Sequence, residues 1–108
     1  MDGLQILIDN ISASNNSFVY YLQEKELFEI EHFNTMCEAI ILVDEELSFK
    51  ERGGITGDVH SLTTKILYHL LNHFNPDNLY SIKNLPTNFQ EYLNKLDEIV
   101  YDFLYYSL

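Results

Sequence analysis

The chain has 108 residues, of which 46% are hydrophobic and 14% aromatic. A chain of this length buries about two-thirds of its unfolded surface, so it can build one core without a metal or a disulfide. The composition is that of a globular protein and excludes a disordered one. Seventeen Asp and Glu residues oppose six Lys and Arg residues, giving a formal net charge of −11. This charge argues against nucleic acid or anionic lipid as partners and favours cationic proteins; the alternative is that the charge serves solubility alone.

The sequence also indicates a compartment. Cys37 is the only cysteine, so no internal disulfide and no cysteine-rich metal site can form. The first ten residues lack the basic flank of a secretory signal. The longest apolar run, residues 39–43, is far too short to span a bilayer. We therefore expect a cytoplasmic protein with no membrane partner.

Hydrophobic spacing predicts three helices in the first half of the chain. Residues 4–11 carry apolar side chains at helical intervals, and Ser17 is placed to cap a second, short helix. The clearest pattern covers residues 28–47, where seven side chains share one face: Ile30, Phe33, Met36, Cys37, Ile40, Ile41 and Leu47. Residues 48–57 are polar and contain three glycines, so we expect a loop there.

The second half predicts two more long stretches of helix. The first begins at Asp58 or Ser61 and stops before Pro76, because the residue before a proline avoids helical geometry. Its inward side chains are Leu62, Ile66, Leu67, Leu70, Leu71 and Phe74. A turn or a single-turn helix follows at residues 77–82. Thr87 and Gln90 resemble a capping box, after which a last helix runs to about Tyr106.

The last helix has a well-defined inward face, formed by Phe89, Leu93, Leu96, Ile99, Val100, Phe103 and Leu104. No segment alternates polar and apolar residues in the manner of a strand. We therefore predict an all-α fold: one domain over residues 1–108, built as a compact bundle of about five helices, three long and two short.

The outer face of that last helix is the first candidate binding surface. Glu98, Tyr101, Asp102 and Tyr105 follow the spacing i, i+3, i+4 and i+7, so they form one strip. Tyrosine buries a large rigid area at low entropic cost, and carboxylates pair with Arg or Lys of a partner. The alternative is that another helix covers these tyrosines.

A second candidate lies on the middle helix. Between residues 24 and 46 eight acids face one base, Lys25. Glu31, Glu38 and Glu45 recur every seven residues on the polar face. Few lysines stand where they would offset these charges through i,i+4 pairs, which disfavours the helix slightly. We interpret the row as a partner surface; the alternative is an ordinary solvated helix face.

Residues with catalytic or metal-binding chemistry give weaker patterns. His69 and His73 have i,i+4 spacing, but the Glu of a zinc-protease motif and a fixed third ligand are missing. We expect them at the rim of an apolar face. Cys37 lies on an apolar face, as a core residue would, and the glycines at 53–57 lack the Lys and spacing of a phosphate loop. We expect no metal, cofactor or catalytic residue, and an enzyme is the least expected class.

Length, acidity, helical class and the strip Glu98-Tyr101-Asp102-Tyr105 together resemble bacterial immunity proteins. Such proteins neutralise toxins of contact-dependent growth inhibition and related polymorphic or bacteriocin systems. The resemblance implies a cytoplasmic inhibitor that binds a basic toxin domain, with a nuclease as the expected kind. Neither Tyr20-Tyr21 nor Tyr105-Tyr106 is followed by the proline of the nuclease-colicin immunity signature, so no residue roles are carried over.

Two other functions fit the same composition. One is a nucleic-acid mimic that inhibits a DNA-binding or defence enzyme, which would need carboxylates spaced like phosphates. The other is a helical adaptor or regulator that dimerises through its last helix, which would give a concentration-dependent mass. Direct nucleic-acid binding is excluded most firmly, because one Arg and five Lys cannot form a basic footprint.

Overall fold

The computed structural model describes residues 2–106, apart from the side chains of Phe49 and Tyr106. Its helices are α1 (Gly3–Ile11), α2 (Phe18–Glu24), α3 (Ile30–Glu46), α4 (Phe49–Arg52), α5 (Ile55–Phe74) and α6 (Phe89–Tyr101). A π-helical turn, η1 (Asp102–Tyr106), continues α6. Within the described residues β structure is limited to an isolated bridge between Leu27 and Lys83. The predicted all-α class is confirmed, with six helices in place of about five.

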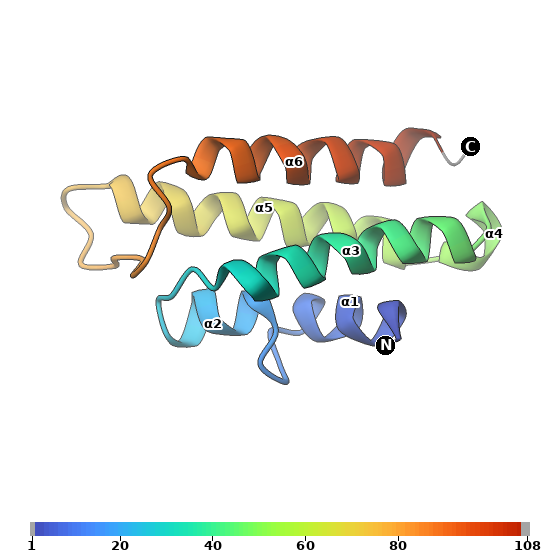
Figure 1. The fold of residues 1–108 in the computed structure, drawn as a ribbon, viewed down its shortest axis with the longest axis horizontal. Coiled ribbons are helices and arrows are strands. Elements are labelled where there is room, and N and C mark those ends of the chain that lie inside the picture. The colour runs from blue at the N-terminus through green and yellow to red at the C-terminus, as the bar shows by residue number, and fades with distance from the viewer. Residues whose placement is uncertain (1, 107–108) are drawn as a thin grey trace.

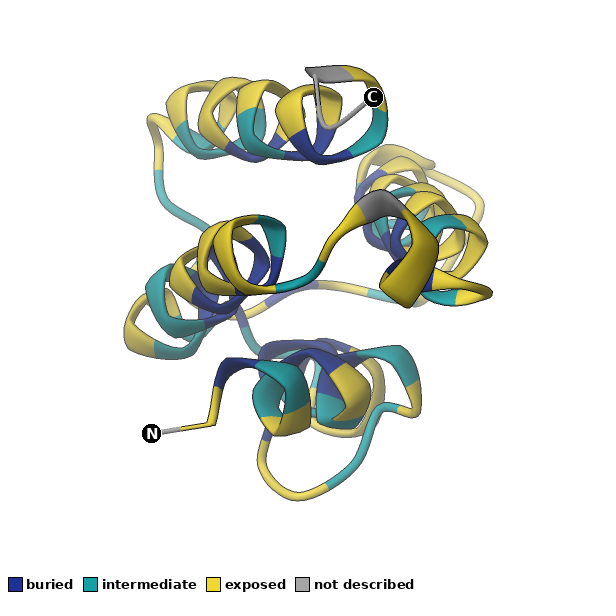
Figure 2. Cartoon of the chain, turned by 90° about the vertical axis from the view of Figure 1, so that its right-hand side faces the viewer, coloured by how far each residue is buried: buried dark blue, intermediate teal, exposed yellow. Residues whose placement is uncertain are grey.

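The helices form three layers (Figure 1). α1 and α2 lie on one side, α6 lies on the opposite side, and α3 and α5 run between them, as the end-on view also shows (Figure 2). α3 and α6 point in one direction, whereas α1, α2 and α5 point in the other. Buried residues face the space between the layers, and the outer surface of α6 is exposed along its length (Figure 2).

Side-chain caps set the starts of the first helices. The Leu4 N–H donates to Asp2 Oδ1 at 3.0 Å. The Tyr20 N–H donates to Ser17 Oγ at 3.2 Å, so the predicted cap on α2 is confirmed. Each cap satisfies a backbone donor that has no partner inside its helix. These two caps fix where α1 and α2 begin against the central layer.

A cluster of phenylalanine rings fills one end of the core. The rings of Phe18 and Phe28 lie 5.1 Å apart between centroids, and Phe18 and Phe33 lie 5.2 Å apart, both edge to face. At the start of α1, a Cβ added to Gly3 would lie 3.1 Å from the Cβ of Leu42, so a larger residue would require Leu42 to shift slightly and glycine allows the close approach of α1 to α3. Cys37 is buried in the core as predicted, and burial raises the pKa of its thiol to about 11.

The loop predicted for residues 48–57 is wrong, because helix occupies most of it. Ser48 caps α4 through a capping box: the Glu51 N–H donates to Ser48 Oγ, and the Ser48 N–H donates to Glu51 Oε1 at 2.9 Å. α5 begins at Ile55, earlier than the predicted Asp58 or Ser61. A glycine inside a helix costs only about 1 kcal/mol, and Val59, which is fully buried, offsets that cost for Gly57.

The capping box predicted at Thr87 is also wrong. Pro86 opens a turn that is closed by a hydrogen bond from the Phe89 N–H to the Pro86 carbonyl at 3.1 Å. The N-cap is therefore Asn88, which makes no side-chain bond to the helix backbone. In the preceding connection, a turn at residues 76–77 is present, whereas residues 78–82 are irregular and not helical. The Ile82 N–H donates to Nδ1 of His73 at 2.8 Å and ties this segment to α5.

On α5 and α3, some residues that were predicted to face the core are exposed to solvent. On α5 the buried line is Val59, Leu62, Ile66 and Leu70, while Leu67, Leu71 and Phe74 are 45%, 68% and 57% exposed. On α3, Ile30 and Ile41 are also exposed, at 38% and 41%. The physical reason is that neighbouring helices cover only one side of α5. The apolar residues of α5 extend further around the helix than this covered side, so those beyond it are exposed to solvent.

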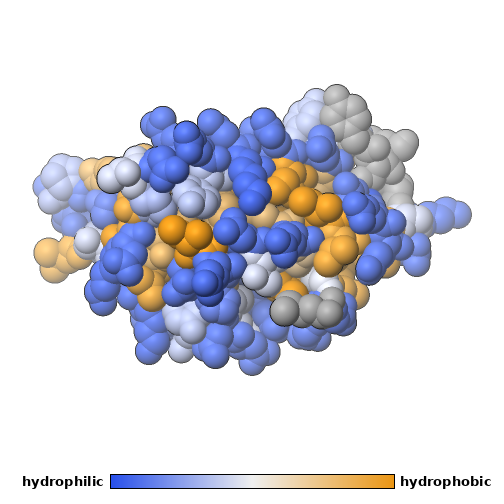
Figure 3. Space-filling model, in the orientation of Figure 1, coloured by the Kyte–Doolittle hydropathy of each residue, from blue (hydrophilic) through white to orange (hydrophobic). Residues whose placement is uncertain are grey.

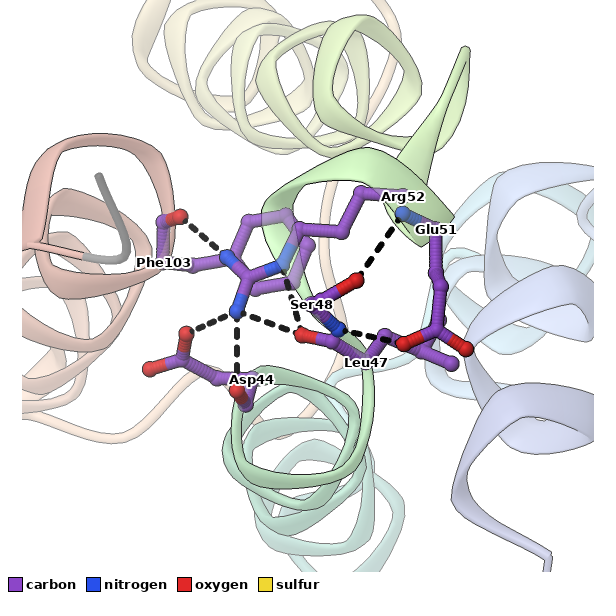
Figure 4. Close-up of polar contacts among 6 residues, drawn as sticks. All are labelled: Asp44, Leu47, Ser48, Glu51, Arg52 and Phe103. Carbon is purple, nitrogen blue, oxygen red and sulfur yellow. Dashed lines mark hydrogen bonds and ion pairs between the residues drawn. The ribbon is translucent and has the colours of Figure 1, made fainter.

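Arg52, the only arginine, is 3% exposed and joins three helices (Figure 4). Its Nη1 donates to the Phe103 carbonyl at 2.7 Å, and its Nη2 pairs with Asp44 Oδ1 at 2.6 Å. Its Nη2 also donates to the carbonyls of Asp44 and Leu47, and its Cζ lies 4.5 Å from the Phe103 ring centroid. Carbonyls at helix ends lack internal partners and attract cations. Arg52 therefore caps α3 and η1 together.

Candidate protein-binding surface

The first predicted surface, the α6 strip, comprises Glu98, Tyr101, Asp102 and Tyr105. All four residues are exposed, with Tyr101 at 52% and Tyr105 at 58%. The two rings lie 4.8 Å apart between centroids. More than half of each of these two tyrosines is exposed, and α6 is the outermost layer of helices (Figure 2), so the tyrosines are not sealed inside the fold. The alternative of buried tyrosines is therefore wrong, and the predicted strip exists as one surface.

The α6 strip borders two hollows. One is acidic and lies on α6 itself, lined by Asp97, Glu98, Tyr101 and Asp102. The other is a groove between α5 and α6, lined by His60, Thr63, Thr64, Leu67, Asp97, Val100, Tyr101, Leu104 and Tyr105. Asp97 and Tyr101 line both hollows, and no described lining residue is a Lys or Arg. The tyrosines thus separate an acidic surface from a largely apolar one.

The second predicted surface, the α3 row of Glu31, Glu38 and Glu45, is exposed along α3. α3 and α6 are neighbours, joined by a hydrogen bond from Lys95 Nζ to Asn34 Oδ1 at 3.3 Å. The face that carries α3 is mostly hydrophilic with separate hydrophobic spots (Figure 3), and the exposed apolar residues of α3 include Ile41 and Leu42. The α3 row contains no aromatic residue, so it supplies charge without a large apolar anchor.

The histidines have local structural roles. His69 and His73 are half-buried at the edge of α5, as predicted. The His69 ring lies 5.3 Å from the Tyr80 ring, and burial lowers the pKa of His69, with Lys65 adding to the shift. Tyr80 in turn donates its hydroxyl to the Leu22 carbonyl at 2.7 Å. Among residues 2–106, no three His, Cys, Asp or Glu side chains are grouped to hold a metal ion.

The groove between α5 and α6 was missed in the sequence. A signal for it was present: the apolar positions of α5 span a wider arc than one packing face accommodates. The exposed apolar residues of α5 that lie beyond its packing face are Leu67, Leu71 and Phe74. Asp97, which lines both hollows, was also not singled out, because it lies one position before the strip.

Within the described part of the chain, no helix combines the length and apolarity needed to cross a bilayer. No family model matches the sequence, and no curated protein or solved structure proves similar to the chain. The surface must therefore be interpreted from its own chemistry.

Proposed function

We propose that this chain is an immunity-type inhibitor that binds and neutralises a cationic toxin domain, with a nuclease as the class that fits best. The observation that carries the proposal is the α6 strip, in which two exposed tyrosines accompany the carboxylates Glu98 and Asp102 on the outermost layer, with Asp97 beside them. Aromatic anchors surrounded by charge are the usual energetic centre of a protein interface.

The charge gives a reason for the choice of partner. A nuclease has a basic cleft because its substrate is a polyanion. An inhibitor with a net charge of −11 is drawn to such a cleft over long range, which speeds association at low salt. The tyrosines then supply the desolvated contact that long-range attraction does not.

The α3 row enlarges the same interface. A stable complex needs about 800 Å² from each partner, more than one strip of four residues offers. Because α3 runs beside α6 (Figure 1), a partner seated on the α6 strip reaches the acids of α3 across Lys95. In this proposal the α6 strip is the centre of the interface and the α3 row its charged edge.

Spacing favours this function over a nucleic-acid mimic. α3 and α6 do run side by side in one direction, and both carry acids. Acids seven residues apart on a helix, such as Glu31 and Glu38, are about 10 Å apart along its axis. One DNA strand carries a phosphate every ~3.4 Å of axis, so the α3 row carries fewer charges per length than a DNA strand. A dimerising adaptor is disfavoured because two copies would bring like charges together.

A two-step experiment tests the proposal. A photo-crosslinking phenylalanine derivative replaces Tyr105, or Gln23 on α2 as a control, in the native host. A protein captured from position 105 alone is then expressed by itself and together with this chain. We expect it to be basic and to arrest growth when alone, and we expect co-expression to restore growth.

Charge reversal makes the test specific. E98K/D102K should abolish growth rescue and make the residual binding less sensitive to salt. The control E24K/D77K reverses two exposed acids elsewhere, and each double variant changes the net charge from −11 by +4 to −7. If E98K/D102K folds poorly by circular dichroism, D97K/E98K replaces it. A captured protein that is harmless, or equal rescue by both double variants, would contradict the proposal.

A further inference from the structure

The groove between α5 and α6 has apolar walls and two unlike edges. Leu67, Val100 and Leu104 contribute the aliphatic surface, with the ring of Tyr101 at the α6 edge. That edge is acidic through Asp97 and continues into the α6 strip, whereas the α5 edge is formed by His60 and Thr64. The hollow measures about 440 Å³, enough for several aliphatic side chains.

We infer that the partner inserts an amphipathic helix into this groove, with Lys or Arg along one edge of its apolar face. This inference rests on the proposed function, because it identifies the element by which the cationic protein is bound. The apolar face of that helix contacts Leu67 and Leu104. Its basic edge faces Asp97 and, beyond the tyrosines, Glu98.

A helix fits because of how the groove is built. Both walls are helices, whose backbone groups bond internally, so the groove offers no edge to which a strand could add. A third helix can lay its side chains between the side-chain rows of two helices. The lining of α5 runs from His60 to Leu67, which is about 10 Å along the axis, or two turns. Anchors at i, i+3 or i+4, and i+7 match that length.

The acidic edge selects the charge of the occupant. A second copy of this chain would bring its own acids, and its net charge of −11, against the same edge. Like charges facing each other across an interface are unfavourable. A helix with basic residues on the α6 side and uncharged residues on the α5 side satisfies both edges. This asymmetry distinguishes the expected partner from a generally cationic peptide.

A designed peptide probes the groove directly. The probe is a fluorescein-labelled peptide of 18 residues with Leu at i, i+3, i+4 and i+7 and Lys along one edge of that face. A scrambled peptide of equal composition is the control. We expect the patterned peptide to bind about tenfold more tightly and to shift the amide resonances of Leu67, Val100 and Leu104.

A matched pair of variants localises the binding. L67D should weaken the patterned peptide about tenfold, which is the effect of placing a charge against an apolar contact. L79D makes the same substitution at a side chain that is 100% exposed and should change nothing. L67A, which adds no charge, should weaken binding to a smaller extent if L67D perturbs the fold.

Several results would overturn the inference. These are equal binding of the two peptides, resonance shifts confined to the α3 row, equal affinity of L67D and L79D, or self-association of the chain that the peptide reverses. The captured toxin separates this inference from the proposed function. If L67D still rescues growth while E98K/D102K does not, the groove inference fails and the proposed function stands. If E98K/D102K rescues fully, the proposed function fails whatever the groove binds.

Discussion

The Arg52 junction and the α6 strip lie at the same end of the molecule and use the same kinds of group. At the junction a guanidinium meets a carboxylate, backbone carbonyls and the Phe103 ring, and it is almost fully buried (Figure 4). On the strip, carboxylates and the rings of Tyr101 and Tyr105 face solvent. Within residues 101–105, Phe103 is therefore buried against Arg52, whereas Tyr101 and Tyr105 are exposed to solvent.

The contrast between the Arg52 junction and the α6 strip shows where a strongly acidic chain places its few basic residues. At the junction the chain supplies both partners of each interaction, so the contact stabilises the fold. On the strip it supplies aromatic and acidic groups, and in the proposed function the cation comes from another protein. Contacts of a cation with carboxylates and aromatic rings therefore stabilise the fold when the cation belongs to this chain. In the proposed function they bind a partner when the cation belongs to that partner.

The largest expected effect is at the junction. Arg52→Met should lower the free energy of unfolding by about 3–5 kcal/mol, because it removes the buried guanidinium that bonds the Asp44 carboxylate and the helix-end carbonyls together. Urea unfolding measures this loss. Lys50→Met is the matched control, since Lys50 lies on the same short helix and is exposed. A loss below about 1 kcal/mol for Arg52→Met would mean that the junction contributes no more stability than an exposed salt bridge does.

The next effect concerns the strip. Tyr105→Ala should weaken binding of the captured toxin by about 2 kcal/mol, the scale of an interface hot spot, and leave thermal stability nearly unchanged. Glu98→Ala should cost less than about 1 kcal/mol, because an exposed carboxylate beside the aromatic anchors contributes less to affinity than the rings themselves. Calorimetric titration compares the two variants. If Tyr105→Ala lowered stability and left the affinity unchanged, Tyr105 would be a structural residue and not a binding residue.

A smaller effect separates the real capping box from the predicted one. Ser48→Ala should cost about 1 kcal/mol of stability, because Ser48 Oγ accepts from the Glu51 N–H at the start of α4, which carries Arg52. Thr87→Ala should cost much less, because Thr87 is not the cap of α6. Thermal unfolding of the two variants gives the comparison. Equal losses would contradict the observed cap positions.

The smallest effect depends on pH and should involve neither region. Burial lowers the pKa of His69 in the folded chain, so the unfolded chain takes up this proton first as the pH falls. The free energy of unfolding should therefore decrease as the pH drops below about 6.5, and flatten once the folded state also binds the proton. His69→Gln should reduce this slope in urea unfolding relative to the unchanged chain. Identical slopes would exclude His69 as the cause.

Local features of the structure were predictable from the sequence. The α6 strip depends only on helical periodicity near the end of the chain, so the spacing of Glu98, Tyr101, Asp102 and Tyr105 was sufficient. The cap at Ser17 is equally local. The capping box at Ser48 and Glu51 also had its signature in the sequence, but the nearby glycines suggested a loop and hid it.

Features that depend on contacts between distant residues were not predictable. The bond from Arg52 to the Phe103 carbonyl joins residues 51 positions apart, and no periodicity signals it. The exposure of Leu67 and Leu71 depends on how many neighbours surround α5, which its own sequence does not specify. The inward faces of α5 and α3 were therefore misassigned in part, because hydrophobic spacing identifies a helix face but not how much of that face is covered.

The widened turn η1 has a consequence for how the protein responds to warming. The N–H of Asp102 is shared between the carbonyls of Glu98 and Ile99, and Arg52 bonds the next residue, Phe103, from outside the helix. The end of a helix frays before its interior melts. Arg52 opposes this fraying by holding the Phe103 carbonyl, so in the proposed function the chain would keep hold of its partner on warming until the Arg52 junction opens.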